Sequence, residues 1–114
     1  MPHASYEAAD VRLRLARLLR NESDVSIKRQ AYVIVEYLDI RGGERILDCG
    51  CGLGYLLQIL SRLYGQSGPQ MGISLHGMDP DEKSLDFARE MLRSHQIHFL
   101  RGDATSLPYA DASF

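Results

Sequence analysis

Residues 44–54 read Glu-Arg-Ile-Leu-Asp-Cys-Gly-Cys-Gly-Leu-Gly, and this stretch decides the fold class of the chain. A short apolar run ends in a carboxylate, Asp48, and the apolar segment 53–63 follows soon after it. Between them, three glycines stand at alternate positions: Gly50, Gly52 and Gly54. A strand, a tight glycine-rich turn and a helix in this order are typical of a nucleotide site in an open α/β sheet.

The rest of the chain alternates between helical and strand patterns. Apolar periodicity predicts two helices within 1–41, separated by a polar break at 21–24. Further along, it predicts three strands at 45–48, 73–78 and 97–101 and two connecting helices at 53–64 and 80–94. This order predicts an α/β fold, in which a parallel sheet of three strands is covered by helices on both faces and preceded by two N-terminal helices.

Each predicted strand ends in an acidic residue. Asp48 and Asp79 end the first two strands, and Asp103 follows the third. Because the carboxyl ends of parallel strands share one edge of the sheet, the three carboxylates should face one crevice. Such a crevice favours a ligand rich in hydroxyls, amines or cationic centres. Asp79 has a second interpretation as the N-cap of the next helix, with Pro80 as the first helical residue and Glu82 completing a capping box.

Two kinds of nucleotide are candidates for the glycine turn. The pyrophosphate of a dinucleotide needs backbone N–H groups without a carboxylate close by. Asp48 would repel it, and the third glycine comes one residue earlier than in the dinucleotide fingerprint G-x-G-x-x-G. S-adenosylmethionine has no phosphate and presents an ammonium, a sulfonium and a ribose diol, which a carboxylate attracts. The residues therefore favour S-adenosylmethionine over NAD(P).

With these residues in place, the chain resembles the class I S-adenosylmethionine-dependent methyltransferases. The matching segments are Leu-Asp-Cys-Gly-Cys-Gly-Leu-Gly at 47–54, His-Gly-Met-Asp-Pro at 76–80, Gly-Asp-Ala at 102–104 and Leu-Pro-Tyr-Ala-Asp-Ala-Ser-Phe at 107–114. The last segment is similar to the subgroup that contains the ubiquinone and menaquinone methyltransferases and many small-molecule enzymes. The resemblance implies a Rossmann-like fold, with 1–41 as an N-terminal helical segment and 42–114 as a partial S-adenosylmethionine-binding domain.

The resemblance also implies roles for residues of the first strand and its turn. Asp48 would orient the ammonium of the methionine part, directly or through water. The three glycines would let the backbone approach the methionine part and the ribose.

Residues after the second and third strands would hold the nucleoside. By the same resemblance, Asp79 would bind the ribose diol, and Pro80 would lie against the adenine ring. Asp103 would accept a hydrogen bond from the adenine amino group, and the backbone N–H of Ala104 would meet a ring nitrogen.

Composition excludes several other classes of function. The net charge of −2 gives no electrostatic reason to bind nucleic acid, and no apolar run approaches the roughly 20 residues that span a bilayer. The first residues lack the pattern of a signal peptide, so we expect a cytoplasmic protein. The two cysteines, Cys49 and Cys51, have no partner cluster for zinc, and we expect reduced thiols and no metal site.

Several other side chains are expected to have structural roles. The histidines are interpreted as surface or packing residues: His3, His76, His95 and His98. The arginines within 12–20 are interpreted as a solvated helix face, with steering of an anionic acceptor as the alternative.

The sequence therefore predicts a methyltransferase that acts on an oxygen, nitrogen or carbon of a small-molecule acceptor. The alternatives are an NAD(P)-binding oxidoreductase and a non-catalytic cofactor-binding module. The family's domain has about seven strands, so this chain is expected to hold the cofactor half and to lack the acceptor half. We expect it to be inactive alone. No catalytic residue and no oligomeric state can be assigned from the sequence.

Overall fold

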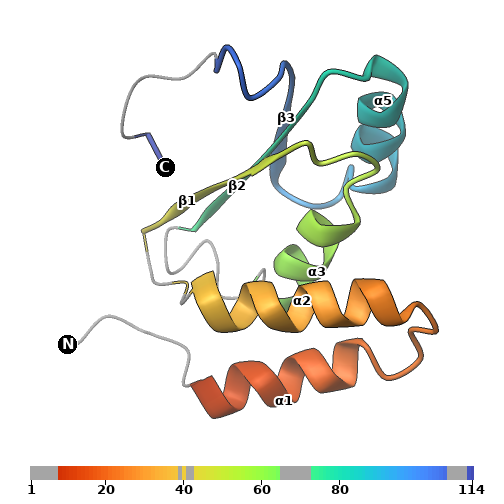
Figure 1. Ribbon diagram of the computed structural model, residues 1–114, viewed down its shortest axis with the longest axis vertical. Helices are drawn as coiled ribbons and strands as arrows, with labels where there is room; N and C mark the ends of the chain where they lie inside the picture. Colours follow the sequence, from red (N-terminus) through yellow and green to blue (C-terminus); the bar gives the residue numbers. More distant parts are fainter. Residues whose placement is uncertain (1–7, 39, 41–42, 65–72, 108–112) are drawn as a thin grey trace.

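The computed structural model describes residues 8–38, 40, 43–64, 73–107 and 113–114, with backbone only for 8–10 (Figure 1). The predicted loop at 65–72, the segment 108–112 and His3 lie outside the described residues. In chain order, the elements are α1 (Ala8–Leu18), α2 (Val25–Leu38), β1 (Arg45–Cys49), α3 (Tyr55–Tyr64), β2 (Ser74–Asp79), α5 (Glu82–Met91) and β3 (Ile97–Arg101). Within these ranges, no helix combines the length and the apolar character that crossing a bilayer requires.

The three strands form a parallel sheet in the order β1-β2-β3, so β2 is the central strand. In register, Asp48 stands beside Gly77, and Asp79 stands beside Arg101. Parallel pairing brings the carboxyl ends of all three strands to one edge of the sheet. The predicted α/β fold is confirmed, and each strand lies within one residue of its expected bounds.

Both connecting helices, α3 and α5, lie on the same face of the sheet (Figure 1). A Cβ atom on Gly77 of β2 would lie 2.7 Å from Leu57 of α3, so helices pack tightly on this face. The opposite face carries His76, whose ring stacks on His98 and meets Phe114 edge-on. The expectation of helices on both faces is therefore met on one face only within the described residues. The reason is topological, because two successive right-handed crossovers that advance in the same direction place both helices on one side.

Of the N-terminal helices, α1 packs onto α3, and α2 packs onto α1. The buried residues Val11 and Leu15 of α1, and Leu19 directly after it, recur at every fourth position. Full burial of one leucine such as Leu15 stabilises the fold by about 1.5–3 kcal/mol. The predicted polar break then starts α2, because Asp24 Oδ1 accepts the backbone N–H of Ser26 at 2.9 Å.

α5 begins two residues later than the sequence predicts. Its N-cap residue is Asp81 rather than Asp79, and Glu82 is the first helical residue, so the predicted capping box does not form. Pro80 precedes the helix and is exposed. The physical cause is that Asp79 Oδ1 accepts the backbone N–H of Asp81 at 2.8 Å, which closes a turn before the helix can start.

Candidate cofactor site at the carboxyl edge of the sheet

The glycine turn at 50–54 folds back onto the end of β2. Its three glycines all have positive φ, with 81° at Gly50, 55° at Gly52 and 86° at Gly54. Side chains with a Cβ rarely adopt these angles. The backbone N–H groups of Gly50 and Cys51 both donate to the carbonyl oxygen of Met78, at 2.7 and 2.9 Å. The turn is therefore fixed to the carboxyl edge of the sheet.

The three glycines serve different purposes. Gly54 starts α3, because its carbonyl accepts the N–H of Gln58, and a Cβ there would lie 3.0 Å from Leu92 of α5. Around Gly50 and Gly52, a Cβ would meet nothing within 4 Å. Gly54 thus permits close packing of α3 against α5. The other two leave a stretch of backbone that a ligand can approach.

Asp79 ties the glycine turn to the end of β2. Its Oδ2 accepts the backbone N–H of Gly52 at 2.9 Å, across 27 residues of sequence, while Oδ1 accepts the N–H of Asp81. A charged acceptor makes stronger hydrogen bonds than a neutral one. The carboxylate that the sequence assigns to the ribose therefore also positions the turn.

Asp48 is half-buried at the end of β1, beside the same turn. Burial, and then the negative charge of Asp79, raise the pKa of the Asp48 carboxyl. The same two acids, after burial, help to raise the pKa of the Cys51 thiol to about 11. Within the described residues, no donor is hydrogen-bonded to the side-chain carboxylate of Asp48. The edge thus holds two neighbouring carboxylates that a cation would stabilise.

The third acid, Asp103, lies on an exposed turn after β3. The carbonyl of Asp79 accepts the backbone N–H of Gly102 at 3.1 Å, which brings the start of this turn to the same edge. Both the hydroxyl and the N–H of Thr105 donate to Asp103 Oδ1, and these bonds lower the pKa of its carboxyl. The neighbouring Ala104 is exposed, as is Pro80. The structure therefore places all the predicted site residues along one edge, with Asp48 and Asp79 nearest to the glycines.

The described cysteines and histidines do not form a second candidate site. Both cysteines are free thiols, and the high pKa of Cys51 keeps it protonated near neutral pH. Nε2 of His76 lies 2.7 Å from Ser74 Oγ at the amino end of β2, the opposite edge from the glycine turn. Nδ1 of His95 lies 2.7 Å from Ser61 Oγ. In the part of the chain that the structure describes, His, Cys, Asp and Glu residues form no group of three that could hold a metal.

Sequence reasoning missed the contact between Gly52 and Asp79. It assigned each residue a ligand, whereas the structure shows that they bind one another across the sheet edge. The signal was present in the pattern, because a carboxylate at the end of the central strand lies beside the turn that follows the neighbouring strand.

Comparison with known proteins agrees with this geometry. Residues 46–114 match the family described as methyltransferase domain. The methyltransferase GfsG of Streptomyces halstedii is 33% identical over 91 residues, which are 76% of this chain and 30% of that protein. A demethylmenaquinone methyltransferase of Lactobacillus johnsonii is 36% identical over 81 residues, which are 68% of this chain and 31% of that protein. This chain therefore spans just under a third of the length of these curated relatives.

Among solved structures, the crystal structure of the [4+2]-cyclase SpnF has the same fold. It matches with a TM-score of 0.61 at 24% identity, over 94% of this chain and 46% of that chain. The family match covers more than half of the present sequence, and it begins in the strand that leads into the glycine turn. The chain therefore belongs to the methyltransferase domain family.

Proposed function

We propose that the protein transfers a methyl group from S-adenosylmethionine to a small-molecule acceptor. The observation that carries the proposal is the pair of carboxylates, Asp48 and Asp79, beside a glycine turn with open space over Gly50 and Gly52. S-adenosylmethionine supplies a methyl group on a positively charged sulfur. Negative charge next to exposed backbone suits such a cation and disfavours a phosphate.

The residues of the carboxyl edge fit this ligand. Asp48, which has no bonded donor among the described residues, is proposed to orient the ammonium of the methionine part. Asp79 is proposed to bind the ribose diol while it keeps its bond to Gly52, since a carboxylate oxygen has more than one lone pair. Gly50 and Gly52 are proposed to admit the ligand to the backbone, because no atom occupies the space above them.

The turn after β3 is proposed to bind the adenine. Asp103 Oδ1 accepts the hydrogen bonds from Thr105, and we assign the Asp103 carboxylate to the adenine amino group. The backbone N–H of exposed Ala104 is assigned to a ring nitrogen, and exposed Pro80 to the face of the ring. These are the weaker contacts of the set, because all three residues are open to solvent.

The acceptor side of the proposal rests on the relatives. One of them is named a demethylmenaquinone methyltransferase, which favours an aromatic or quinone-like small molecule as the acceptor. Transfer by in-line displacement depends chiefly on positioning the acceptor against the methyl group, so no general base is assigned. A cytoplasmic location, and the division into a helical segment at 1–41 and a cofactor-binding part at 42–114, remain predictions.

Two alternatives are tested by the same experiment. An NAD(P)-dependent oxidoreductase is disfavoured by the charge of Asp48 and by the early third glycine of the turn. Asp79 does not discriminate, because an acid at this place also binds the ribose of dinucleotides. A reaction other than methyl transfer stays open, because the structurally similar SpnF is described as a cyclase and one fold hosts many reactions.

The experiment is isothermal titration of the protein with S-adenosylhomocysteine and, separately, with NAD, followed by an assay of labelled methyl transfer to demethylmenaquinol. We expect this chain to bind S-adenosylhomocysteine saturably and not to bind NAD. Because we expect the chain to be inactive alone, label in the acceptor is expected only from a protein that also contains the acceptor half. Tight binding of NAD with no signal from S-adenosylhomocysteine would overturn the proposal. If a protein that also contains the acceptor half binds S-adenosylhomocysteine but transfers label to no acceptor in a small-molecule panel, the non-catalytic module is supported instead.

A further inference from the structure

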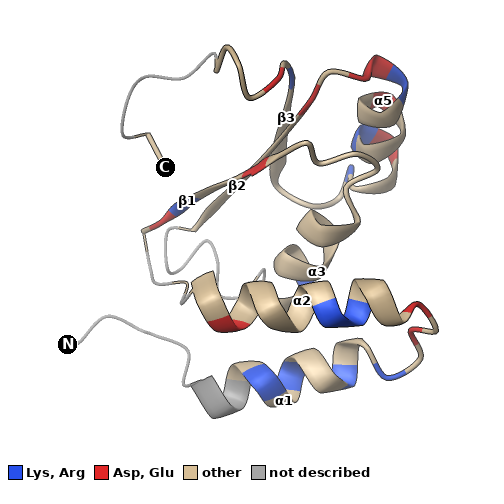
Figure 2. Ribbon diagram, in the orientation of Figure 1, with Lys and Arg blue, Asp and Glu red and all other residues tan. Residues whose placement is uncertain are grey.

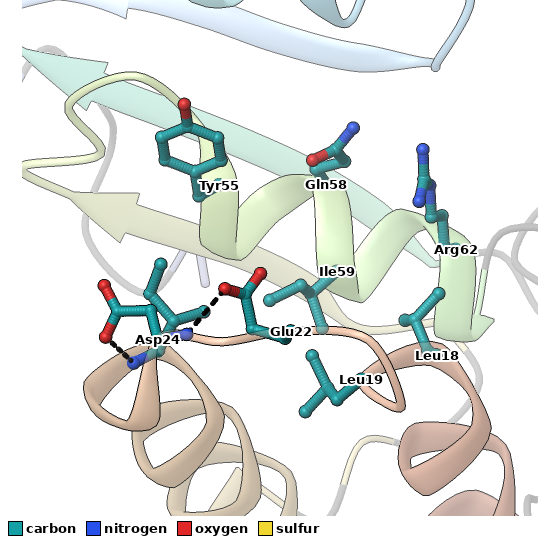
Figure 3. Close-up of a pocket in the computed structure, with 9 residues that line it drawn as sticks. Leu18, Leu19, Glu22, Asp24, Tyr55, Gln58, Ile59 and Arg62 are labelled. Atoms are coloured by element: carbon teal, nitrogen blue, oxygen red, sulfur yellow. Dashed lines mark hydrogen bonds between the residues drawn. The ribbon is translucent and has the colours of Figure 1, made fainter.

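Two adjoining cavities lie along the N-terminal helices. The first, of about 430 Å³, lies between α3 and the turn that joins α1 to α2 (Figure 3). The second, of about 390 Å³, lies between α1 and the last turn of α3. Leu18 and Arg62 line both, so the two cavities form one groove, which we call the α1–α3 groove.

The second cavity is lined by three arginines. Arg14 and Arg17 are three residues apart on α1 and so share one face of that helix, and Arg62 of α3 lines the same cavity. The remaining lining residues are Leu18 and Leu63. Figure 2 colours the basic positions of α1 blue. The positive charge of three arginines that line one cavity would attract an anion.

Two of the three arginines that line this cavity are not ion-paired within the described residues. Elsewhere, Arg12 pairs with Glu36 at 2.8 Å, and Arg89 pairs with Glu82 at 3.1 Å. Arg17 and Arg62 make no such pair within the described ranges. Each stands in the last turn of its helix, where the carbonyl ends of the helix stabilise positive charge. Their positive charge is therefore favoured at these positions without a carboxylate partner among the described residues.

The first cavity has a different lining, which suits the uncharged body of a ligand. Apolar side chains of Leu18, Leu19 and Ile59 form its floor, and Tyr55 and Gln58 extend from α3 beside them (Figure 3). Two acids, Glu22 and Asp24, lie at its far side and accept backbone N–H groups at the start of α2. Their charge opposes entry of an anion at this end of the groove, so the anionic group of a ligand belongs at the arginines.

We propose that the α1–α3 groove binds a small anionic molecule, whose carboxylate or phosphate lies between Arg14, Arg17 and Arg62 and whose apolar body extends over Leu18 toward Tyr55. Guanidinium groups match both oxyanions, because their paired N–H donors form two parallel hydrogen bonds. Seven residues separate Tyr55 from Arg62, which is about 10 Å along the helix axis. The site is thus distinct from the carboxyl edge and does not depend on the proposed methyl transfer.

The test is titration of the protein with pyrophosphate and with citrate in about 0.15 M NaCl, where exposed charges are screened. The variant is Arg17→Gln/Arg62→Gln. The matched control is Arg20→Gln/Arg29→Gln, which removes the same charge from exposed positions outside the groove. We expect saturable binding of at least one anion, weakened about tenfold or more in the variant and unchanged in the control. The anion that binds more tightly identifies phosphate or carboxylate as the ligand class.

Three outcomes would overturn the proposal. One is the absence of saturable binding for both anions, and another is an equal loss of affinity in variant and control. The third is binding of heparin alone, which would indicate an extended polyanion surface. A parallel titration with S-adenosylhomocysteine distinguishes the groove from the carboxyl edge, because the groove variant should leave the affinity for S-adenosylhomocysteine unchanged. Thermal unfolding of both variants confirms that any loss of anion binding is not a loss of fold.

Discussion

The two ends of α3 carry opposite charge. Its amino end follows the glycine turn and meets the carboxylates of Asp48 and Asp79. Its last turn carries Arg62, next to Arg14 and Arg17 of α1. The amino end presents exposed backbone and two acids, of which Asp48 is half-buried and Asp79 is hydrogen-bonded to the glycine turn. The carboxyl end presents long side chains on the surface.

The difference shows how one helix can support two kinds of binding. A helix has partial positive charge at its amino end and partial negative charge at its carboxyl end, worth typically 0.3–1 kcal/mol to a charge of opposite sign. The acids and the arginines each lie at the end that stabilises them. The helix therefore helps to hold the cation-binding edge and the arginine end of the groove about 10 Å apart along its axis.

The largest expected effect is on the geometry of the amino end. Gly54→Ala adds a Cβ that would collide with Leu92 and Ala88, at a residue with φ of 86°. We expect a loss of about 3 kcal/mol in the free energy of unfolding, from overpacking and from the left-handed backbone together. Urea unfolding measures it. The control Gly50→Ala has the same backbone strain and open space around the Cβ, and should lose only about 1–2 kcal/mol. Equal losses would contradict the packing role of Gly54.

The next effect is on cofactor affinity. In Asp79→Asn, the amide keeps an oxygen for Asp81 but loses the negative charge and the second acceptor that Gly52 uses. Binding of S-adenosylhomocysteine should weaken by about 1–3 kcal/mol, the range for a lost hydrogen bond to a charged group. Isothermal titration measures it, with exposed Asp86→Asn on α5 as the control. Unchanged affinity in Asp79→Asn would remove this residue from the site.

A smaller effect concerns the pH dependence of stability. Burial and the nearby charge of Asp79 raise the pKa of Asp48 above its usual value of 3.8. The folded state then binds a proton more tightly than the unfolded state, so this stabilisation is present below pH 3.8 and is lost as pH rises through the raised pKa. Asp48→Asn should therefore be more stable than the wild type near pH 7 and about as stable near pH 3, while binding S-adenosylmethionine more weakly. Unfolding curves at the two pH values measure the gap, and a gap independent of pH would contradict the assignment.

The smallest effect tests whether the two ends of α3 are independent. Arg62→Gln changes an exposed side chain at the groove and leaves the carboxyl edge intact. The free energy of unfolding should stay within about 0.5 kcal/mol of the wild type, as for most surface substitutions. S-adenosylhomocysteine affinity should stay within about twofold. A larger loss of affinity would show that the groove and the edge are coupled.

Most of the fold could be predicted from the sequence, because apolar periodicity and glycine punctuation are local signals. β3 has its predicted bounds, and Asp24 caps α2 as the polar break suggests. The start of α5 was predicted wrongly, because Asp79 has two possible hydrogen-bond partners and the chain alone does not show which it takes. The arrangement of α3 and α5 on one face follows from strand order, which periodicity does not reveal.

The site was predictable in its residues but not in its contacts. The edge position of Asp48, Asp79 and Asp103 follows from parallel strands, whereas the bond from Gly52 to Asp79 depends on how the turn folds over β2. The α1–α3 groove was not predictable in the same way. Arg62 is separated from Arg17 by 45 residues, and only the packing of α1 on α3 brings them to one cavity.

The proposed binding of S-adenosylmethionine at the carboxyl edge of the sheet can be tested directly. The most direct measurement is a titration of the isotopically labelled protein with S-adenosylhomocysteine, followed by the backbone amide resonances in NMR spectra. We expect saturable shifts of the amide resonances of Gly50, Gly52 and Ala104, and no shift at Arg62. Shifts confined to the helices, or the absence of shifts at both glycines while the ligand binds, would contradict it.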